Sequence, residues 1–303
     1  MRPKTRQSIK LADLQILQSQ HYPLADIPAY QFLPASQAAS LVISAPHGGL
    51  YYPSDFIEMT ATRLGLMRSL EDTATATIAK GLYQTDRPVI MATLSRALID
   101  LNRPAKALDP LLYDQAPLPM DKSHHFTAYI EAGYGVMPRL SADRKSLYDA
   151  PLPLQKAKEL ITQFYHPYHA KLSHMIDHAQ PHALVVDIHS MPDSAHSKPL
   201  PDFVFGDNFG TTLPHEYRVL IDKFMTEAGW SFGWNHPYAG GYITRHYGHL
   251  HGPAHSLQIE INRRRYCTKT HHISPLAIAE ITDILNRLCS QIEAMQRRMM
   301  AAE

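Results

Sequence analysis

The chain is poor in cysteine and has no excess of either charge. Its 303 residues include two cysteines, Cys267 and Cys289, too few for a disulfide framework and typical of a reducing compartment. The 29 basic residues nearly balance the 28 acidic ones. Neither sign forms a stripe or a tail, so we expect no nucleic-acid partner. Recognition should therefore depend on a few local charges.

Long apolar runs are also missing. No stretch approaches the ~20 apolar residues of a membrane helix. The first residues, MRPKTRQSIKLADLQILQ, lack the uninterrupted apolar segment of a signal peptide. A hydrophobic content of 45% is normal for a globular protein and, at this length, allows one large or two modest domains. We expect a soluble, cytoplasmic protein with no membrane partner.

Short apolar runs alternate with helical patterns along the chain. The strands are predicted at 41–45, 88–94, 183–189, 202–206 and 256–262, and the helices at about 67–84, 152–180, 214–229 and 274–300. This order predicts an α/β fold with a mainly parallel sheet covered by helices on both faces. We interpret residues 1–38 as an irregular N-terminal leader and 39–303 as a single domain.

Polar residues that could carry chemistry follow or interrupt three of these strands. His47 comes after the first, beside two glycines that allow close approach of the backbone. Asp187 and His189 share a face of another strand, because side chains alternate. Asp187 could hold His189 or a more distant metal ligand, or the two could form a structural hydrogen bond. Glu260 is a candidate general base, unless its face of the strand is exposed to solvent.

Together, several spaced motifs resemble those of the N-formylglutamate amidohydrolase family. They are APHGG with Pro53, EDT at 71–73, SRALIDLNRP at 95–104, FYHPYHAKL at 164–172, DIHSMP at 187–192, LPDFVFGDNFGTT at 200–212, and NHPYAGGYITRHYG through HSLQIEINRRRY. They follow the family's order from about residue 40 to 266. The resemblance implies a zinc carboxypeptidase-like and aspartoacylase-like fold with a mixed sheet.

The resemblance also implies a metal site. His47 and His189 correspond to the two histidine ligands of a zinc ion, one per chain, although such sites accept other divalent metals. The carboxypeptidase pattern would place a glutamate where this chain has Leu50. The resemblance instead implies Asp72 as the third ligand, because it matches the family's aspartate in the following segment, with the neighbouring Glu71 as the alternative. Ala74 stands where the family often has a second aspartate.

The implied reaction is hydrolysis of the N-formyl amide of N-formyl-L-glutamate, to glutamate and formate, by a metal-activated water in histidine degradation. Glu260 would act as the base and Arg96 would stabilise the oxyanion. The substrate carboxylates would bind to Asn102, Arg103 and Arg245.

Two other functions stay open from the sequence. One is a zinc amidohydrolase that acts on another N-acyl amino acid or on a peptidoglycan fragment. The other is an inactive homologue that binds a metal or a ligand, which the presence of Glu260 disfavours.

Overall fold

The structure is a computed structural model that describes residues 24–54, 56, 64–115, 126–195, 198–268 and 272–301. The chain divides into two compact units that interleave in sequence. Unit 1 takes the described residues of Met1–Leu33, Gly49–Glu71 and Ile90–His169, and unit 2 takes those of Pro34–Gly48, Asp72–Val89 and Ala170–Glu303. The expectation of one domain over 39–303 stays a prediction, and most of the proposed leader lies outside the described residues.

Unit 2 contains most of the strands. Its elements are β2 (Leu41–Ala45), α4 (Thr75–Gly81), β4 (Ala183–Met191), β5 (Ser194–Ala195), β6 (Lys198–Pro199), β7 (Phe203–Gly206), α8 (His215–Glu227), β8 (Phe232–Trp234), α9 (Tyr242–Tyr247), β9 (Ala254–Asn262), the short η4 (Arg263–Arg265) and α10 (Pro275–Met300). Unit 1 contains η1 (Leu24–Asp26), β1 (Tyr30–Leu33), α3 (Leu64–Arg68), α5 (Thr127–Glu131), α6 (Leu154–Leu160) and the π-helical turn η3 (Ile161–Tyr165). Strand β3 (Val89–Ala92) and helix α7 (His166–Asp177) include residues of both units.

The main sheet has seven strands, and five of them follow one another in unit 2 in the order β2-β4-β9-β7-β8. Strand β4 pairs in parallel with β2 and β9, and β7 pairs in parallel with β8, whereas β7 and β9 are antiparallel. The prediction of a mixed, mainly parallel α/β sheet is confirmed. Every residue of β2, β4 and β9 is buried, as expected for central strands covered on both faces.

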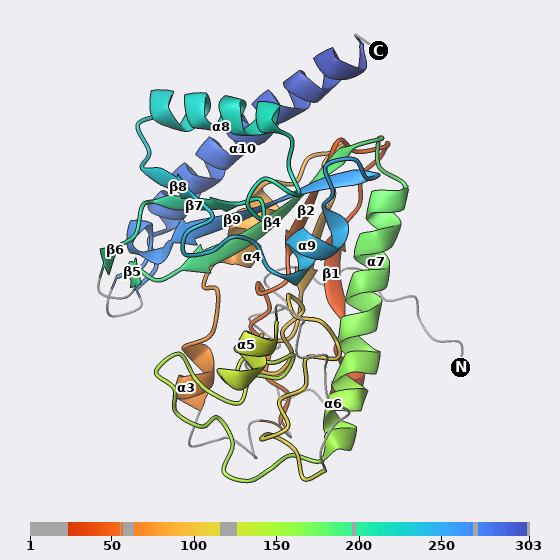
Figure 1. Cartoon of the computed structure of the whole chain (residues 1–303), viewed down its shortest axis with the longest axis vertical. Helices are drawn as coiled ribbons and strands as arrows, with labels where there is room; N and C mark the ends of the chain where they lie inside the picture. Colours follow the sequence, from red (N-terminus) through yellow and green to blue (C-terminus); the bar gives the residue numbers. More distant parts are fainter. Residues whose placement is uncertain are drawn as a thin grey trace. The chain divides into compact units, whose positions relative to one another are not determined.

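Helices of unit 2 cover these strands. Helix α10 packs against α4 and α8, while α4 contacts β2 and β4, and α9 contacts β4 and β9 (Figure 1). In this view α9 lies in front of the strands and α4 behind them, so both faces are covered. Ser274 caps the N-terminus of α10: its side chain accepts a hydrogen bond from the backbone N–H of Ala277, and Pro275 begins the helix. Among the described helices, none combines the length and apolar character that a membrane crossing requires.

Two local predictions were wrong. The helix expected over 67–84 is divided into α3 and α4, because Ala74 adopts a left-handed conformation with φ 67°. The leader was expected to be irregular up to residue 38, but Tyr30–Leu33 forms β1. Two prolines, Pro28 and Pro34, flank this strand and limit its length.

Candidate metal centre

Three buried side chains of unit 2 meet near the ends of β2 and β4. His47 lies just after β2, His189 lies within β4, and Asp72 lies in the loop before α4. The Oδ2 atom of Asp72 is 3.2 Å from Nδ1 of His47 and 3.0 Å from Nδ1 of His189. One possible ligand atom from each residue lies within 4.8 Å of the others. Within the described part of the chain, no other group of three histidine, cysteine, aspartate or glutamate residues gathers this closely.

The tautomer of His189 is set by its second ring nitrogen. Nε2 of His189 donates to Oδ2 of Asp187 at 2.8 Å, and the other oxygen of Asp187 accepts from the hydroxyl of Ser44 at 2.7 Å. A neutral imidazole that donates from Nε2 presents only a lone pair at Nδ1. This lone pair faces the Asp72 carboxylate, which is also an acceptor. Two acceptors at 3.0 Å repel each other unless positive charge lies between them, which either a proton on Nδ1 of His189 or a bound metal ion supplies.

The negative charges around His189 favour a positive charge on its ring. Burial alone would lower the pKa of His189, but the Asp187 carboxylate, the hydrogen bond to Asp72 and the charge of Glu260 together raise this pKa well above the ordinary value of a histidine. The site therefore attracts positive charge. Two histidine nitrogens and one carboxylate oxygen are also a donor set that zinc takes in catalytic sites. The residues present fit a divalent metal.

The loop that carries Asp72 is fixed by hydrogen bonds to its backbone. The hydroxyl of Thr75 donates to the carbonyl of Asp72 at 2.7 Å, and the hydroxyl of Tyr266 donates to the carbonyl of Thr73 at 2.7 Å. Ala74 then turns the chain with its positive φ. Helix α4 begins directly after this turn. Asp72 therefore lies outside any helix, and its carboxylate is directed at the two histidines.

Glu71 is placed differently from Asp72. Its carboxylate accepts a hydrogen bond from the hydroxyl of Tyr52 at 2.8 Å. Burial is the main reason that the pKa of Glu71 is raised. Of the two neighbouring acids, Asp72 is the one that faces both histidines.

Close packing against α4 explains why a glycine, Gly48, follows His47. A Cβ atom at this position would lie 2.9 Å from Cβ of Ala76 in α4. The absence of a side chain therefore allows the first turn of α4, and Asp72 before it, to approach the end of β2.

Glu260 faces the same side of the sheet as the histidine of β4. In the parallel register of β4 and β9, His189 is opposite Glu260. Side chains of such pairs point to the same face. Glu260 is buried, with 6% of its surface exposed, so this face of β9 is not the solvent-exposed face considered above.

Arg245 lies in α9, on a half-buried part of unit 2. Its Nε donates to the carbonyl of Gly240 at 3.3 Å, at the end of the glycine-rich segment before the helix. Its function in binding a substrate carboxylate stays a prediction.

The other predicted polar residues belong to unit 1. Arg96 donates to Oδ2 of Asp100 at 2.8 Å, and the backbone N–H of Asn102 donates to the other oxygen of Asp100. Arg103 donates to the carbonyls of Asn102 and Tyr134 and stacks over the ring of Tyr129 at 4.3 Å. Arg96 and Asn102 thus share the buried carboxylate of Asp100, and Arg103 adjoins them through the carbonyl of Asn102. Their roles toward a substrate stay predictions.

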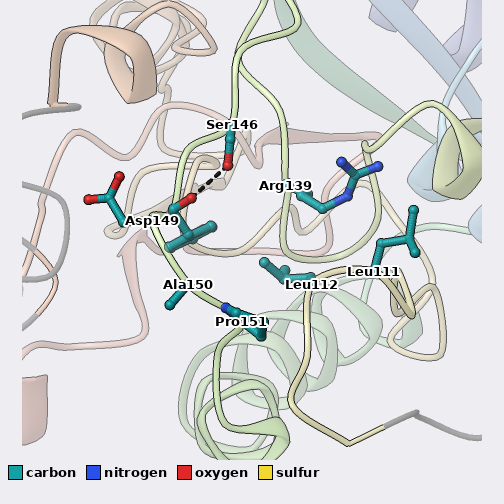
Figure 2. A pocket seen from close by; sticks show the side chains of 8 residues that line it. Leu111, Leu112, Arg139, Ser146, Asp149, Ala150 and Pro151 are labelled. Carbon is teal, nitrogen blue, oxygen red and sulfur yellow. Dashed lines mark hydrogen bonds between the residues drawn. The ribbon is translucent and has the colours of Figure 1, made fainter.

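A cavity of about 230 Å³ lies elsewhere in unit 1 (Figure 2). Its lining includes Leu111, Leu112, Arg139 and Pro151, and Nε of Arg139 donates to Asp109 at 2.7 Å. It contains none of the predicted site residues.

Sequence reasoning missed two residues that hold others in place. Ser44 donates to Asp187, and Asp100 accepts from two of the predicted residues. The sequence gives a signal for Ser44, since it is the one polar residue within the apolar run 41–45 that precedes His47. No comparable pattern distinguishes Asp100 from a surface acid.

The fold and the site define the class as a mixed α/β protein with a candidate divalent-metal centre of two histidines and one aspartate. The family model for N-formylglutamate amidohydrolase matches residues 39–267. This chain therefore belongs to the N-formylglutamate amidohydrolase family.

Named relatives agree with this membership. The chain is 32% identical over 247 residues to N-formylglutamate deformylase of Pseudomonas putida, a match that covers 76% of this chain and 82% of the relative. It is 27% identical to N-formylglutamate deformylase of Pseudomonas aeruginosa, with 70% and 77% of the two chains covered. The crystal structure of N-formylglutamate amidohydrolase from Ralstonia eutropha JMP134 is similar, with a TM-score of 0.78, 28% identity, and coverage of 90% of this chain and 99% of that one.

Proposed function

We propose that this protein hydrolyses the formyl amide of N-formyl-L-glutamate and releases glutamate and formate. Support comes from its family and from two relatives named N-formylglutamate deformylase. The observation that carries the proposal is the cluster of His47, Asp72 and His189 with Glu260 opposite His189 in the sheet register. A site of this kind suits amide hydrolysis, because it places a base beside a metal-binding group.

His47, Asp72 and His189 would hold the metal, and we propose zinc, one ion per chain. A bound divalent ion supplies Lewis acidity, which polarises the amide carbonyl and lowers the pKa of water to about 7. Asp187 and Ser44 keep the ring of His189 in the orientation that turns Nδ1 toward the site.

Glu260 moves the proton in the proposed reaction. Its carboxylate takes a proton from the water whose oxygen attacks the formyl carbon. It then gives this proton to the amide nitrogen, so that the carbon–nitrogen bond breaks and the free amine of glutamate leaves with formate as the second product. Burial of Glu260 excludes bulk water, which would otherwise exchange protons with it.

Arginine and asparagine side chains complete the proposal. The substrate has two carboxylates, and we assign their binding to Arg245, Asn102 and Arg103 because arginine suits carboxylate recognition. Arg96 is assigned to the developing oxyanion. We place the activity in the cytoplasm and in the degradation of histidine, as the family resemblance suggests.

The test measures formate released from N-formyl-L-glutamate by protein as purified, after chelator treatment, and after zinc is added back. Loss on chelation and recovery at about one zinc per chain would support the proposal. No formate from zinc-loaded protein would overturn it. Equal or faster turnover of N-formyl-L-alanine or N-acetyl-L-glutamate would overturn the assigned substrate and leave the metal chemistry intact. The variant with both His47→Ala and His189→Ala should bind no metal and serves as the control.

A further inference from the structure

Two rows of side chains cross the strands of unit 2 on the face that carries the metal centre. The register pairs Ser44 with Asp187, and Asp187 with Gln258. One pleat further along, it pairs His189 with Glu260. The row of Ser44, Asp187 and Gln258 therefore lies beside the row of His189 and Glu260. Asp187 precedes His189 by two residues on β4, and Gln258 precedes Glu260 by two residues on β9.

On β4 a hydrogen bond joins the two rows. Asp187 accepts from His189, two residues later, and so fixes the direction of the ring. On β9 the same spacing recurs. Nε2 of Gln258 donates to Oε1 of Glu260, two residues later, at 2.8 Å. Gln258 thus has the same relation to the proposed base that Asp187 has to the metal ligand.

The orientation of the Gln258 amide is fixed by a second contact. Its other end faces the backbone N–H of Gly241 at 2.8 Å. A backbone N–H can only donate, so the atom that faces it must be the carbonyl oxygen Oε1. The amide NH₂ is then the group that faces Glu260. Gln258 is buried, with 4% of its surface exposed, so water does not compete for either contact.

The Gly241 contact is itself held in place. Gly240, with φ 119°, has a conformation that favours glycine, and a Cβ atom at Gly206 would lie 2.8 Å from the backbone nitrogen of Gly240. The segment therefore packs directly on β7, which is the neighbour of β9. It continues into α9, where Arg245 donates back to the carbonyl of Gly240.

We propose that Gln258 is a positioning residue for Glu260: it holds the carboxylate by a neutral hydrogen bond and links it, through Gly241, to the segment that carries Arg245. A neutral donor suits this task. A lysine or arginine here would fix the carboxylate too, but its charge would make the base weaker. The inference rests on the proposed function, since it assigns Gln258 to the base of that reaction.

The test is a double-mutant cycle in zinc-loaded protein with N-formyl-L-glutamate as substrate. Gln258→Met removes both hydrogen bonds and keeps the length of the side chain. We expect kcat to fall about ten- to a hundredfold, as for a misplaced catalytic group, with KM within about twofold. In the Glu260→Gln background the same change should have little further effect, because the residue acts through Glu260.

Gln296→Met is the matched control. Gln296 is equally buried, with 6% exposed, and donates to the carbonyl of Ser40 from α10. This variant should lose stability but keep kcat per folded, zinc-loaded molecule in both backgrounds. If Gln258→Met does not fold, Gln258→Asn, one CH₂ too short to reach both partners, replaces it and should give the same cycle.

The outcomes separate the two proposals. Equal loss of kcat from the Gln258 change in both backgrounds would show a structural role and overturn the inference, as would unchanged kcat in the wild-type background. Absence of formate release by the zinc-loaded wild-type protein would instead overturn the proposed function.

Discussion

Replacement of Asp187 tests how the site is held together. Asp187 joins two hydrogen bonds, from Ser44 at 2.7 Å and from Nε2 of His189 at 2.8 Å. In Asp187→Asn the hydroxyl of Ser44 can turn to accept from the new amide, which leaves the asparagine oxygen for His189. The ring then keeps its direction but loses the charge of its partner. In Asp187→Ala the ring loses both its fixed direction and its charged partner.

The expected effect on zinc affinity follows from this difference. Loss of the partner of a metal-binding histidine weakens metal affinity by roughly 10- to 100-fold, or about 1.4 to 2.8 kcal/mol. We expect Asp187→Asn near the lower limit and Asp187→Ala near the upper one. Ser44→Ala, which keeps the carboxylate, should have a smaller effect than either.

Competition with a chromophoric chelator measures the zinc dissociation constants of these variants, and circular dichroism checks that each is folded. Asp202→Asn is the control. Asp202 is another aspartate of unit 2 with little exposure, but its partners are Ser231 and Arg264. Zinc affinity in Asp187→Ala equal to that of the wild type would refute the idea that Asp187 orients His189 toward a metal.

Three further predictions concern substrate binding and stability. Arg245→Met should raise KM for N-formyl-L-glutamate about tenfold or more, since hydrogen bonds to charged groups contribute roughly 1.5–3 kcal/mol; unchanged KM in steady-state assays would contradict this role. Ala74→Gly should raise the free energy of unfolding by about 1 kcal/mol, because glycine adopts the left-handed φ of 67° at this position without the steric cost that alanine has. A lower free energy of unfolding in urea titrations would contradict this. Glu293→Ala should lower that free energy by about 3–5 kcal/mol, because it leaves the guanidinium of the fully buried Arg87 without its carboxylate; a loss below 1 kcal/mol would argue against this.

The central strands could be predicted from sequence because burial on both faces demands continuous apolar runs. The run at 41–45 corresponds to β2, and the runs at 183–189 and 256–262 correspond to most of β4 and β9. Alternation within a strand also predicts that Gln258 and Glu260 share a face. It does not give the register between strands, which depends on how whole segments pack. The opposition of His189 and Glu260 therefore appears first in the structure.

The loop around Asp72 could not be predicted for a different reason. The residues from 67 to 84 have a helical pattern, and nothing in the local sequence marks Ala74 as left-handed, since alanine favours helices. Packing of α4 against Gly48 and the hydrogen bond from Tyr266, far away in sequence, fix the turn. Local sequence also cannot distinguish Asp72 from Glu71 as the acid that faces the histidines, because the two residues are adjacent and their directions depend on how the loop packs.

Turnover by Glu260→Gln is the most direct test of the claim that this site is catalytic. The substitution keeps the shape of the side chain and removes the base. We expect the variant to be folded, to bind about one zinc per chain and to retain its KM, while kcat for formate release falls by roughly two or more orders of magnitude. Near-normal kcat in folded, zinc-loaded Glu260→Gln would contradict the account.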